Sequence, residues 1–219
     1  MKRTVLIGAA VALVAAGAAF AAHLELKTDA FNPGHAQVSI ASDWVKGAGV
    51  PDGKRGEGLL LEISQTVAYP PGASADATVE GAKGLTLKSL GFDRLLGTYC
   101  TNGSPRWDVE TSNGGVYAVG CASGVHSTTG MPAGWERITF RDSDFQHLSG
   151  PAWSGFGTPG AKLDFLQVLS DEGPSASILD NIQVNGTVIG GRHGAGDDEH
   201  KDNGNNGNNG NGHDKKHEH

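Results

Sequence analysis

The sequence RWDVETSNGGVYAVGC, residues 106–121, indicates how this chain folds. Trp107 and Val109 alternate with polar residues, which is the period-two pattern of a half-buried β-strand. Residues 112–115 read Ser-Asn-Gly-Gly, and an Asn-Gly pair accepts the positive backbone angles that a tight hairpin turn requires. A second apolar segment, residues 116–121, then returns along the first. The stretch therefore predicts an antiparallel β-hairpin.

Similar alternation occurs before and after this hairpin. In residues 58–68, apolar side chains share one face of an expected strand, at Leu59, Leu61, Ile63 and Val67. We expect further strands at residues 84–90, 135–141, 162–169, 177–184 and 187–189, and turns at residues 72–76 and 155–160. Many short strands separated by turns predict an all-β antiparallel sandwich of the jelly-roll type.

The two ends of the chain do not read as parts of a folded domain. Residues 1–22 combine a basic start, an apolar run and small final residues, the pattern of a cleaved secretory signal peptide; a retained membrane anchor is the alternative. Residues 191–219 have almost nothing to bury and are predicted to be a disordered tail. Residues 23–190 remain for one β-sandwich domain, expected to be secreted or extracytoplasmic, in a periplasm or at a cell surface.

The charge of the chain limits its partners. Its net charge is −7, and removal of Lys2 and Arg3 with the signal peptide leaves 15 basic residues against 24 acidic ones. Nucleic acid and anionic membranes attract basic patches, so we expect neither as a partner. Beyond residue 22 no apolar stretch approaches the length of about 20 residues that spans a bilayer, so no stable membrane insertion is expected.

Cys100 and Cys121 are the two cysteines of the chain. In a secreted protein such a pair forms a disulfide by default, and these two flank the open end of the predicted hairpin. The closed loop of about 20 residues would stabilise the fold by about 3 kcal/mol in the chain-entropy model. Two reactive or metal-binding thiols are the alternative, although no CxxC spacing supports them.

Asp180 stands out in the segment SILDNIQV, residues 177–184. In a regular strand it would share a face with Ile178, Ile182 and Val184, and a carboxylate on an apolar face must be hydrogen-bonded, paired or metal-bound. Carboxylate oxygen suits calcium. A structural hydrogen bond, or an arginine partner at the rim of the sheet, is the alternative.

The same segment carries a resemblance to a known class of domain. Residues 179–186, LDNIQVNG, are similar to the closing strand of jelly-roll sandwiches in several families of secreted carbohydrate-binding modules. In those families an acidic residue near this position often helps to hold a structural calcium ion, so the resemblance implies this role for Asp180 alone. The phrases GSPRWDV and VGCASG resemble segments of uncharacterised secreted bacterial proteins and imply no function.

Asp142 and Asp144 form an Asp-x-Asp pattern after the strand expected at residues 135–141. Such a pair can chelate calcium through both carboxylates, although the Gly and the distant Glu of an EF-hand loop are missing. A solvated acidic loop is the alternative.

The tryptophans are candidates for stacking on sugar rings. Trp107 and Trp135 lie in expected strands and are predicted to pack in the core. Trp153, in the turn-rich segment SGPAWSGFGTPG, is the strongest candidate for a ligand-binding aromatic, followed by Trp44 in SDWVKG. Core packing is the alternative for both.

Sequence signatures of catalysis are missing. The chain has no Gly-x-Ser-x-Gly, HExxH or P-loop pattern. Glu62, Glu110 and Glu136 lie on the polar faces of expected strands, where solvation is the simplest interpretation. Carboxylates of a secreted hydrolase pair in space rather than in sequence, so that function stays open.

These observations favour a secreted, non-catalytic binding or surface module. The preferred partner is a polysaccharide or cell-surface glycan, with a structural calcium near Asp180. The Gly-rich composition leaves a second function open, a self-associating subunit of an extracellular matrix or filament. The tail adds histidines among acidic residues, a tract that can bind transition metals weakly; a solubilising tail is the alternative.

Overall fold

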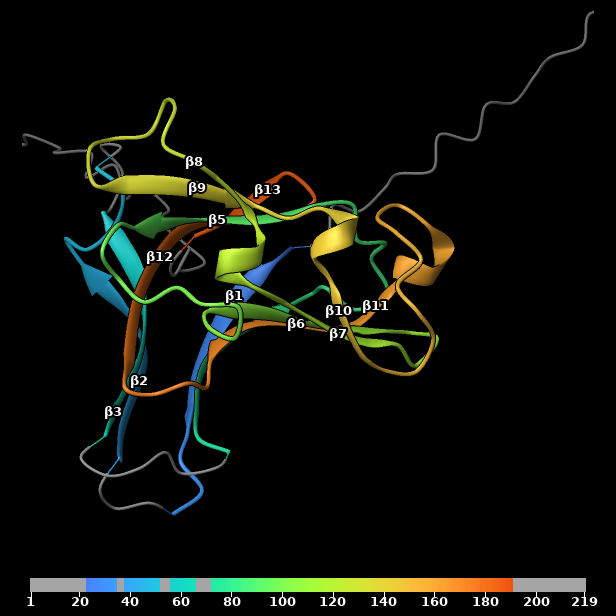
Figure 1. Ribbon diagram of the computed structural model, residues 1–219, viewed down its shortest axis with the longest axis horizontal. Helices are drawn as coiled ribbons and strands as arrows, with labels where there is room; N and C mark the ends of the chain where they lie inside the picture. Colours follow the sequence, from blue (N-terminus) through green and yellow to red (C-terminus); the bar gives the residue numbers. More distant parts are fainter. Residues whose placement is uncertain (1–22, 35–37, 52–55, 66–71, 191–219) are drawn as a thin grey trace, which may run out of the picture.

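In the computed structural model residues 23–34, 38–51, 56–65 and 72–190 are described, and they form two antiparallel β-sheets packed face to face (Figure 1). One sheet, called the β1 sheet here, has the order β1 (Glu25–Phe31), β4 (Ser74–Glu80), β11 (Leu163–Ser170), β6 (Arg106–Thr111), β7 (Val116–Gly120) and β10 (Gln146–Ser149). The other, the β2 sheet, has the order β2 (Val38–Lys46), β3 (Glu57–Gln65), β12 (Ser175–Val184), β5 (Leu90–Leu95), β9 (Trp135–Thr139) and β8 (Val125–Ser127), with β13 (Thr187–Ile189) paired to β12. The predicted all-β sandwich is confirmed.

Strands that pair are often far apart in the sequence, as in other jelly-roll sandwiches. β1 pairs with β4, β4 with β11, and β3 with β12, all antiparallel. Short 3-10 helices lie in the connections, at Cys121–Ser123, Asp142–Asp144 and Pro159–Ala161. The described residues contain no helix with the length and apolar character of a membrane span. The predicted signal peptide and tail lie outside the described residues.

The core lies between the sheets and follows the alternation seen in the sequence. Leu59, Leu61 and Ile63 of β3 are fully buried and belong to one cluster with Trp107 and Val109 of β6. Removal of such apolar surface from water, at about 25 cal/mol per Å², is the main term that holds the sandwich together.

The hairpin predicted at residues 106–121 is present as the antiparallel pair β6 and β7. The disulfide between Cys100 and Cys121 is also confirmed, with a Cα–Cα distance of 5.4 Å. Gly120 lies against the loop that follows Cys100, where a Cβ atom would come 1.8 Å from the carbonyl oxygen of Asn102. Glycine at this position therefore lets the bridged loop pass close over the end of β7.

Two expected segments are wrong. Residues 84–90 form an irregular connection, held by backbone bonds such as Gly84 N–H to Leu163 O, and strand β5 starts only at Leu90. Residues 72–76, expected as a turn, enter strand β4 at Ser74. The buried positions of β4 are mostly alanine. Alanine has low strand propensity, so the sequence pattern does not reveal this strand.

Asn181 interrupts strand β12 and changes which side chains face the core. Its φ of 43° lies in the left-handed region, and the register between β12 and β5 shifts just after Asp180. Leu179, Ile182 and Val184 are therefore fully buried, whereas Asp180 lies half-buried on the outer face. The expectation that Asp180 shares a face with Ile182 and Val184 is wrong, because the irregularity reverses the alternation.

Candidate functional site

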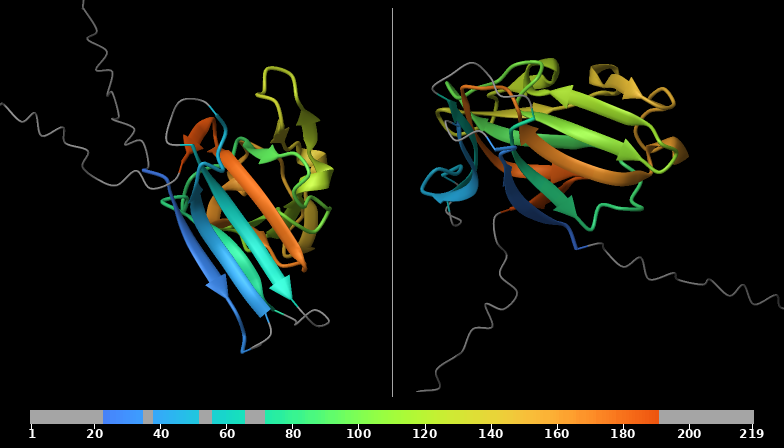
Figure 2. Two further views of the ribbon diagram at one scale, coloured as in Figure 1. Left: turned by 90° about the vertical axis from the view of Figure 1, so that its left-hand side faces the viewer. Right: turned by 90° about the horizontal axis from the view of Figure 1, so that it is seen from below.

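The edge strands β1 and β2 lie next to each other at one side of the sandwich (Figure 2, left). A cleft of about 470 Å³ opens there, which we call the Trp44 cleft. It is lined by Glu25, Leu26, Lys27, Thr28, Asp43, Trp44 and Glu80. Trp44 packs against the core but is only half-buried. Part of the indole therefore stays available to a ligand in the cleft.

The charged groups of the Trp44 cleft come from three strands. Glu25 of β1 lies directly opposite Glu80 of β4, and Asp43 precedes Trp44 on β2. Lys27 is the single basic residue of the lining. All four charged side chains are exposed. Apart from the bond from Trp44 N–H to Asp43 Oδ1, at 2.8 Å, they make no hydrogen bond or ion pair with other described residues.

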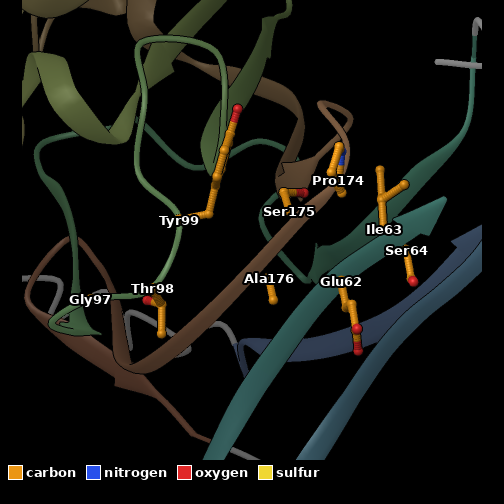
Figure 3. A pocket seen from close by; sticks show the side chains of 9 residues that line it. All are labelled: Glu62, Ile63, Ser64, Gly97, Thr98, Tyr99, Pro174, Ser175 and Ala176. Atoms are coloured by element: carbon orange, nitrogen blue, oxygen red, sulfur yellow. The ribbon is translucent and has the colours of Figure 1, made fainter. Parts of the chain in front are cut away.

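A second hollow, of about 550 Å³, lies on the β2 sheet and is called the Tyr99 groove here (Figure 3). It is lined by Glu62, Ile63, Ser64, Gly97, Thr98, Tyr99, Pro174, Ser175 and Ala176. The chain at residues 97–99 runs beside β12, because Tyr99 N–H donates to Ala176 O at 2.8 Å. β3 borders β12 on its other side.

The ring of Tyr99 is turned away from the polar side of this groove. Figure 3 shows Glu62, Thr98 and Ala176 pointing to one side and Tyr99 to the other. The Tyr99 hydroxyl donates to Glu172 Oε2 at 3.1 Å, and burial together with this carboxylate raises the pKa of Tyr99. The groove thus offers hydroxyl and carboxylate groups with no aromatic face beside them.

Both carboxylate oxygens of Asp180 accept backbone hydrogen bonds. Val50 N–H donates to Oδ2 at 2.7 Å, and Asn181 N–H donates to Oδ1 at 2.6 Å. The first bond holds the segment after β2 against β12. This segment passes close to the carboxylate, because a Cβ atom added at Gly49 would lie only 2.8 Å from Oδ2. These contacts fit the alternative role given above, in which Asp180 accepts structural hydrogen bonds. Calcium binding by Asp180 stays a prediction.

Asp93 of β5 is a buried carboxylate that the sequence did not reveal. Its Oδ1 lies 2.6 Å from Arg137 Nε, and its Oδ2 accepts from Asn181 Nδ2 at 2.8 Å. Burial raises the pKa of Asp93; Asn181 and Arg137 oppose this, and the charge of Asp180 adds to it. The group joins β5, β9 and β12, which is a structural role.

Asp142 and Asp144 lie in one 3-10 helix but point to different partners. Asp142 Oδ1 accepts from Trp153 Nε1 at 2.9 Å and from Phe156 N–H at 2.7 Å. Asp144 Oδ2 accepts from Arg141 N–H at 2.8 Å. The structure therefore brings together two candidates, Asp142 and Trp153, that are separate in the sequence. Calcium binding by the two carboxylates stays a prediction.

Trp153 is half-buried within a small aromatic cluster. It stacks on Phe145, with ring centroids 4.3 Å apart and planes 4° apart, so that one face of the indole is covered. Tyr117 and Phe156 meet it in edge-to-face contacts. With its Nε1 bonded to Asp142, Trp153 has the environment of a packed residue. Ligand binding by Trp153 stays a prediction.

Glu136, expected on a solvated face, is buried between Arg94 and His126, so that expectation is wrong. Arg94 Nε donates to Oε1 at 2.8 Å, and His126 Nδ1 lies 3.0 Å from Oε2. Burial opposes ionisation, but the bonds from Arg94 and His126 outweigh it and lower the pKa of Glu136. His126 Nε2 also lies 3.0 Å from Cys121 O, so the network connects β8 and β9 to the disulfide.

Metal ligands do not gather in the part of the chain that the structure describes: no three His, Cys, Asp or Glu side chains there come together as a metal site. The histidines expected to bind transition metals weakly belong to the tail, outside the described residues. Of the features above, the Trp44 cleft alone combines a partly exposed indole with several charged groups that have few partners.

No protein-family model matches the chain, and no curated protein matches it. One similar solved structure is the family 11 carbohydrate-binding module of a cellulosomal cellulase of Clostridium thermocellum, with 14% identity, a TM-score of 0.43, and coverage of 78% of this chain and 91% of that chain. Another is the family 11 module from Clostridium thermocellum in complex with a β-1,3-1,4-mixed-linked tetrasaccharide, with 14% identity, a TM-score of 0.42, and coverage of 78% and 94%.

Proposed function

We propose that this chain is a non-catalytic carbohydrate-binding domain and that the Trp44 cleft is its binding site. The observation that carries the proposal is the half-buried indole of Trp44 at the wall of an open cleft, with exposed carboxylates and an ammonium group around it. The Tyr99 groove, the other hollow described above, has no aromatic ring on its polar side (Figure 3).

The chemistry of the cleft suits a sugar ring. A pyranose has apolar C–H faces and a rim of hydroxyls. The indole supplies a large, rigid apolar surface on which the C–H face can stack. Carboxylates accept charge-assisted hydrogen bonds from the sugar hydroxyls, and ammonium groups donate such bonds to them. Glu25, Asp43 and Glu80 supply acceptors, and Lys27 supplies donors.

The cleft is also built from strands rather than loops. Trp44 and Asp43 belong to β2, Glu25 and Lys27 to β1, and Glu80 to β4. Strand pairing fixes the backbone of the cleft, so no loop has to be ordered when a ligand binds, and only the exposed charged side chains lose rotamer freedom.

Secretion belongs to this proposal, since a glycan-binding domain meets its ligand outside the cell. The Cys100–Cys121 disulfide supports an oxidising compartment, because such bridges persist mainly outside the cytoplasm.

Affinity electrophoresis in gels that contain neutral, acidic or amino-sugar polysaccharides tests the proposal. We expect retardation of the mature protein in at least one gel and its loss in Trp44→Ala. Trp153→Ala is the comparison variant, because Trp153 is the other half-buried candidate tryptophan and does not line the cleft. Trp44→Phe keeps a ring if the alanine variant fails to fold. Equal retardation of Trp44→Ala and wild type, or no retardation in any gel, would refute the proposal.

A further inference from the structure

The Trp44 cleft carries more negative than positive charge. Three carboxylates, those of Glu25, Asp43 and Glu80, line it together with one ammonium group, that of Lys27. The carboxylates of Glu25 and Glu80 have no partner among the described residues, and the nearest cation on β1, Lys27, lies opposite Thr78. The cleft therefore offers uncompensated negative charge to a ligand.

The placement of Glu25 opposite Glu80 opposes the stability of the sheet. Directly opposed side chains in an antiparallel pair have Cβ atoms about 4.5–5.5 Å apart, and like charges in such a pair are destabilising. A second pair, Asp29 and Asp76, is opposed further along the same strands, so the negative potential extends beyond the cleft. Features that oppose stability without a structural gain are expected at functional sites.

We infer that the Trp44 cleft selects saccharides with free, protonated amino groups over neutral and acidic saccharides. The inference rests on the proposed function and names its ligand class. An ammonium group in the cleft would be attracted by the carboxylates of Glu25 and Glu80 and by the face of the Trp44 indole. The carboxylate of a uronic acid would meet the same groups with repulsion.

Calorimetric titration of the full mature chain with three oligosaccharides of equal length tests the inference. The probes are an oligomer of glucosamine, its N-acetylated counterpart and a uronic-acid oligomer, at about pH 6, where protein carboxylates are ionised. We expect at least tenfold tighter binding of the glucosamine oligomer than of the acetylated one, and a preference that shrinks as salt screens the charges.

Neutral variants locate the selectivity. Glu25→Gln and Glu80→Gln keep size and hydrogen-bonding capacity, and each should weaken binding of the glucosamine oligomer up to about fivefold, the effect of one exposed charge pair. Binding of the acetylated oligomer should change little. The matched control is Glu110→Gln, which removes an exposed carboxylate of β6 outside the cleft.

The outcomes separate the inference from the proposed function. Equal binding of the glucosamine and acetylated oligomers, or tighter binding of the uronic-acid oligomer, would overturn the inference and leave a carbohydrate-binding domain of another specificity. An amine preference of the same size as in wild type in both Glu25→Gln and Glu80→Gln would also overturn it. Binding of no saccharide would overturn both.

Discussion

Glu25 lies directly opposite Glu80 in the register of β1 and β4, at the wall of the Trp44 cleft. A sheet gains nothing from two opposed carboxylates, whereas a cleft that receives a cation gains an attractive field. This relationship links the stability of the β1–β4 pair to the binding of the ligand that we propose. Stability and ligand affinity can be measured separately.

Glu80→Gln should raise stability while it lowers affinity. Removal of one of two opposed like charges is expected to increase the free energy of unfolding by about 0.2–1 kcal/mol. Urea denaturation at low salt measures this. Glu110→Gln should stay within about 0.5 kcal/mol of wild type, because Glu110 lies opposite Val116 and Phe165 rather than another charge. A destabilised Glu80→Gln variant would show that Glu80 has a structural partner.

Glu136→Ala should be strongly destabilising. The substitution leaves the buried guanidinium of Arg94 without its carboxylate, and removal of one partner of a buried ion pair costs about 3–5 kcal/mol. The exposed pair of Lys83 and Asp164 supplies the contrast, since Asp164→Ala should cost no more than about 1 kcal/mol. Similar losses in the two variants, measured by chemical denaturation, would argue against the network around Glu136.

The same network predicts a dependence of stability on pH. The pKa of Glu136 in the folded protein lies below its ordinary value of 4.5. Its ionised form therefore stabilises the fold above that pH, and this contribution is lost as the pH falls through the folded pKa. We expect the difference in melting temperature between wild type and Glu136→Gln to shrink in acid. A difference that is constant from neutral pH to about pH 2 would contradict this.

Asp180→Ala should lower the free energy of unfolding by about 1–3 kcal/mol, because the backbone N–H groups of Val50 and Asn181 lose their acceptor. Thermal unfolding with calcium and then with chelator tests the predicted calcium role in the same protein. A calcium-dependent rise that the variant loses would establish a bound ion. Equal melting with and without calcium would leave Asp180 with a structural role.

Local patterns in the sequence were sufficient for much of the fold. The structure contains the hairpin, the buried strand face and the disulfide that the sequence predicts. The Asn-Gly turn, the alternation around Trp107 and the positions of the two cysteines beside it all lie within one short stretch of sequence. The outer position of Asp180 could not be read in the same way, because asparagine accepts the left-handed backbone found at Asn181 but does not require it.

The candidate site was less predictable, because its parts are distant in the sequence. Trp44 could be named as a candidate, but Glu25 and Glu80 join it only because β1 pairs with β4 and lies beside β2. The prediction of a solvated Glu136 is wrong for the same reason, since the burial of Glu136 depends on Arg94, which is 42 residues away in the sequence. Contacts of this kind follow from the order of strands in the two sheets.

The most direct test of the central claim is an NMR titration that follows the indole N–H signals of Trp44, Trp107, Trp135 and Trp153 while a glucosamine oligomer is added. A saccharide in the Trp44 cleft should shift the Trp44 signal in a saturable way and leave those of the buried Trp107 and Trp135, and of the packed Trp153, almost unchanged. A saturable shift of Trp153 with Trp44 unmoved, or no shift of any indole signal, would contradict the account.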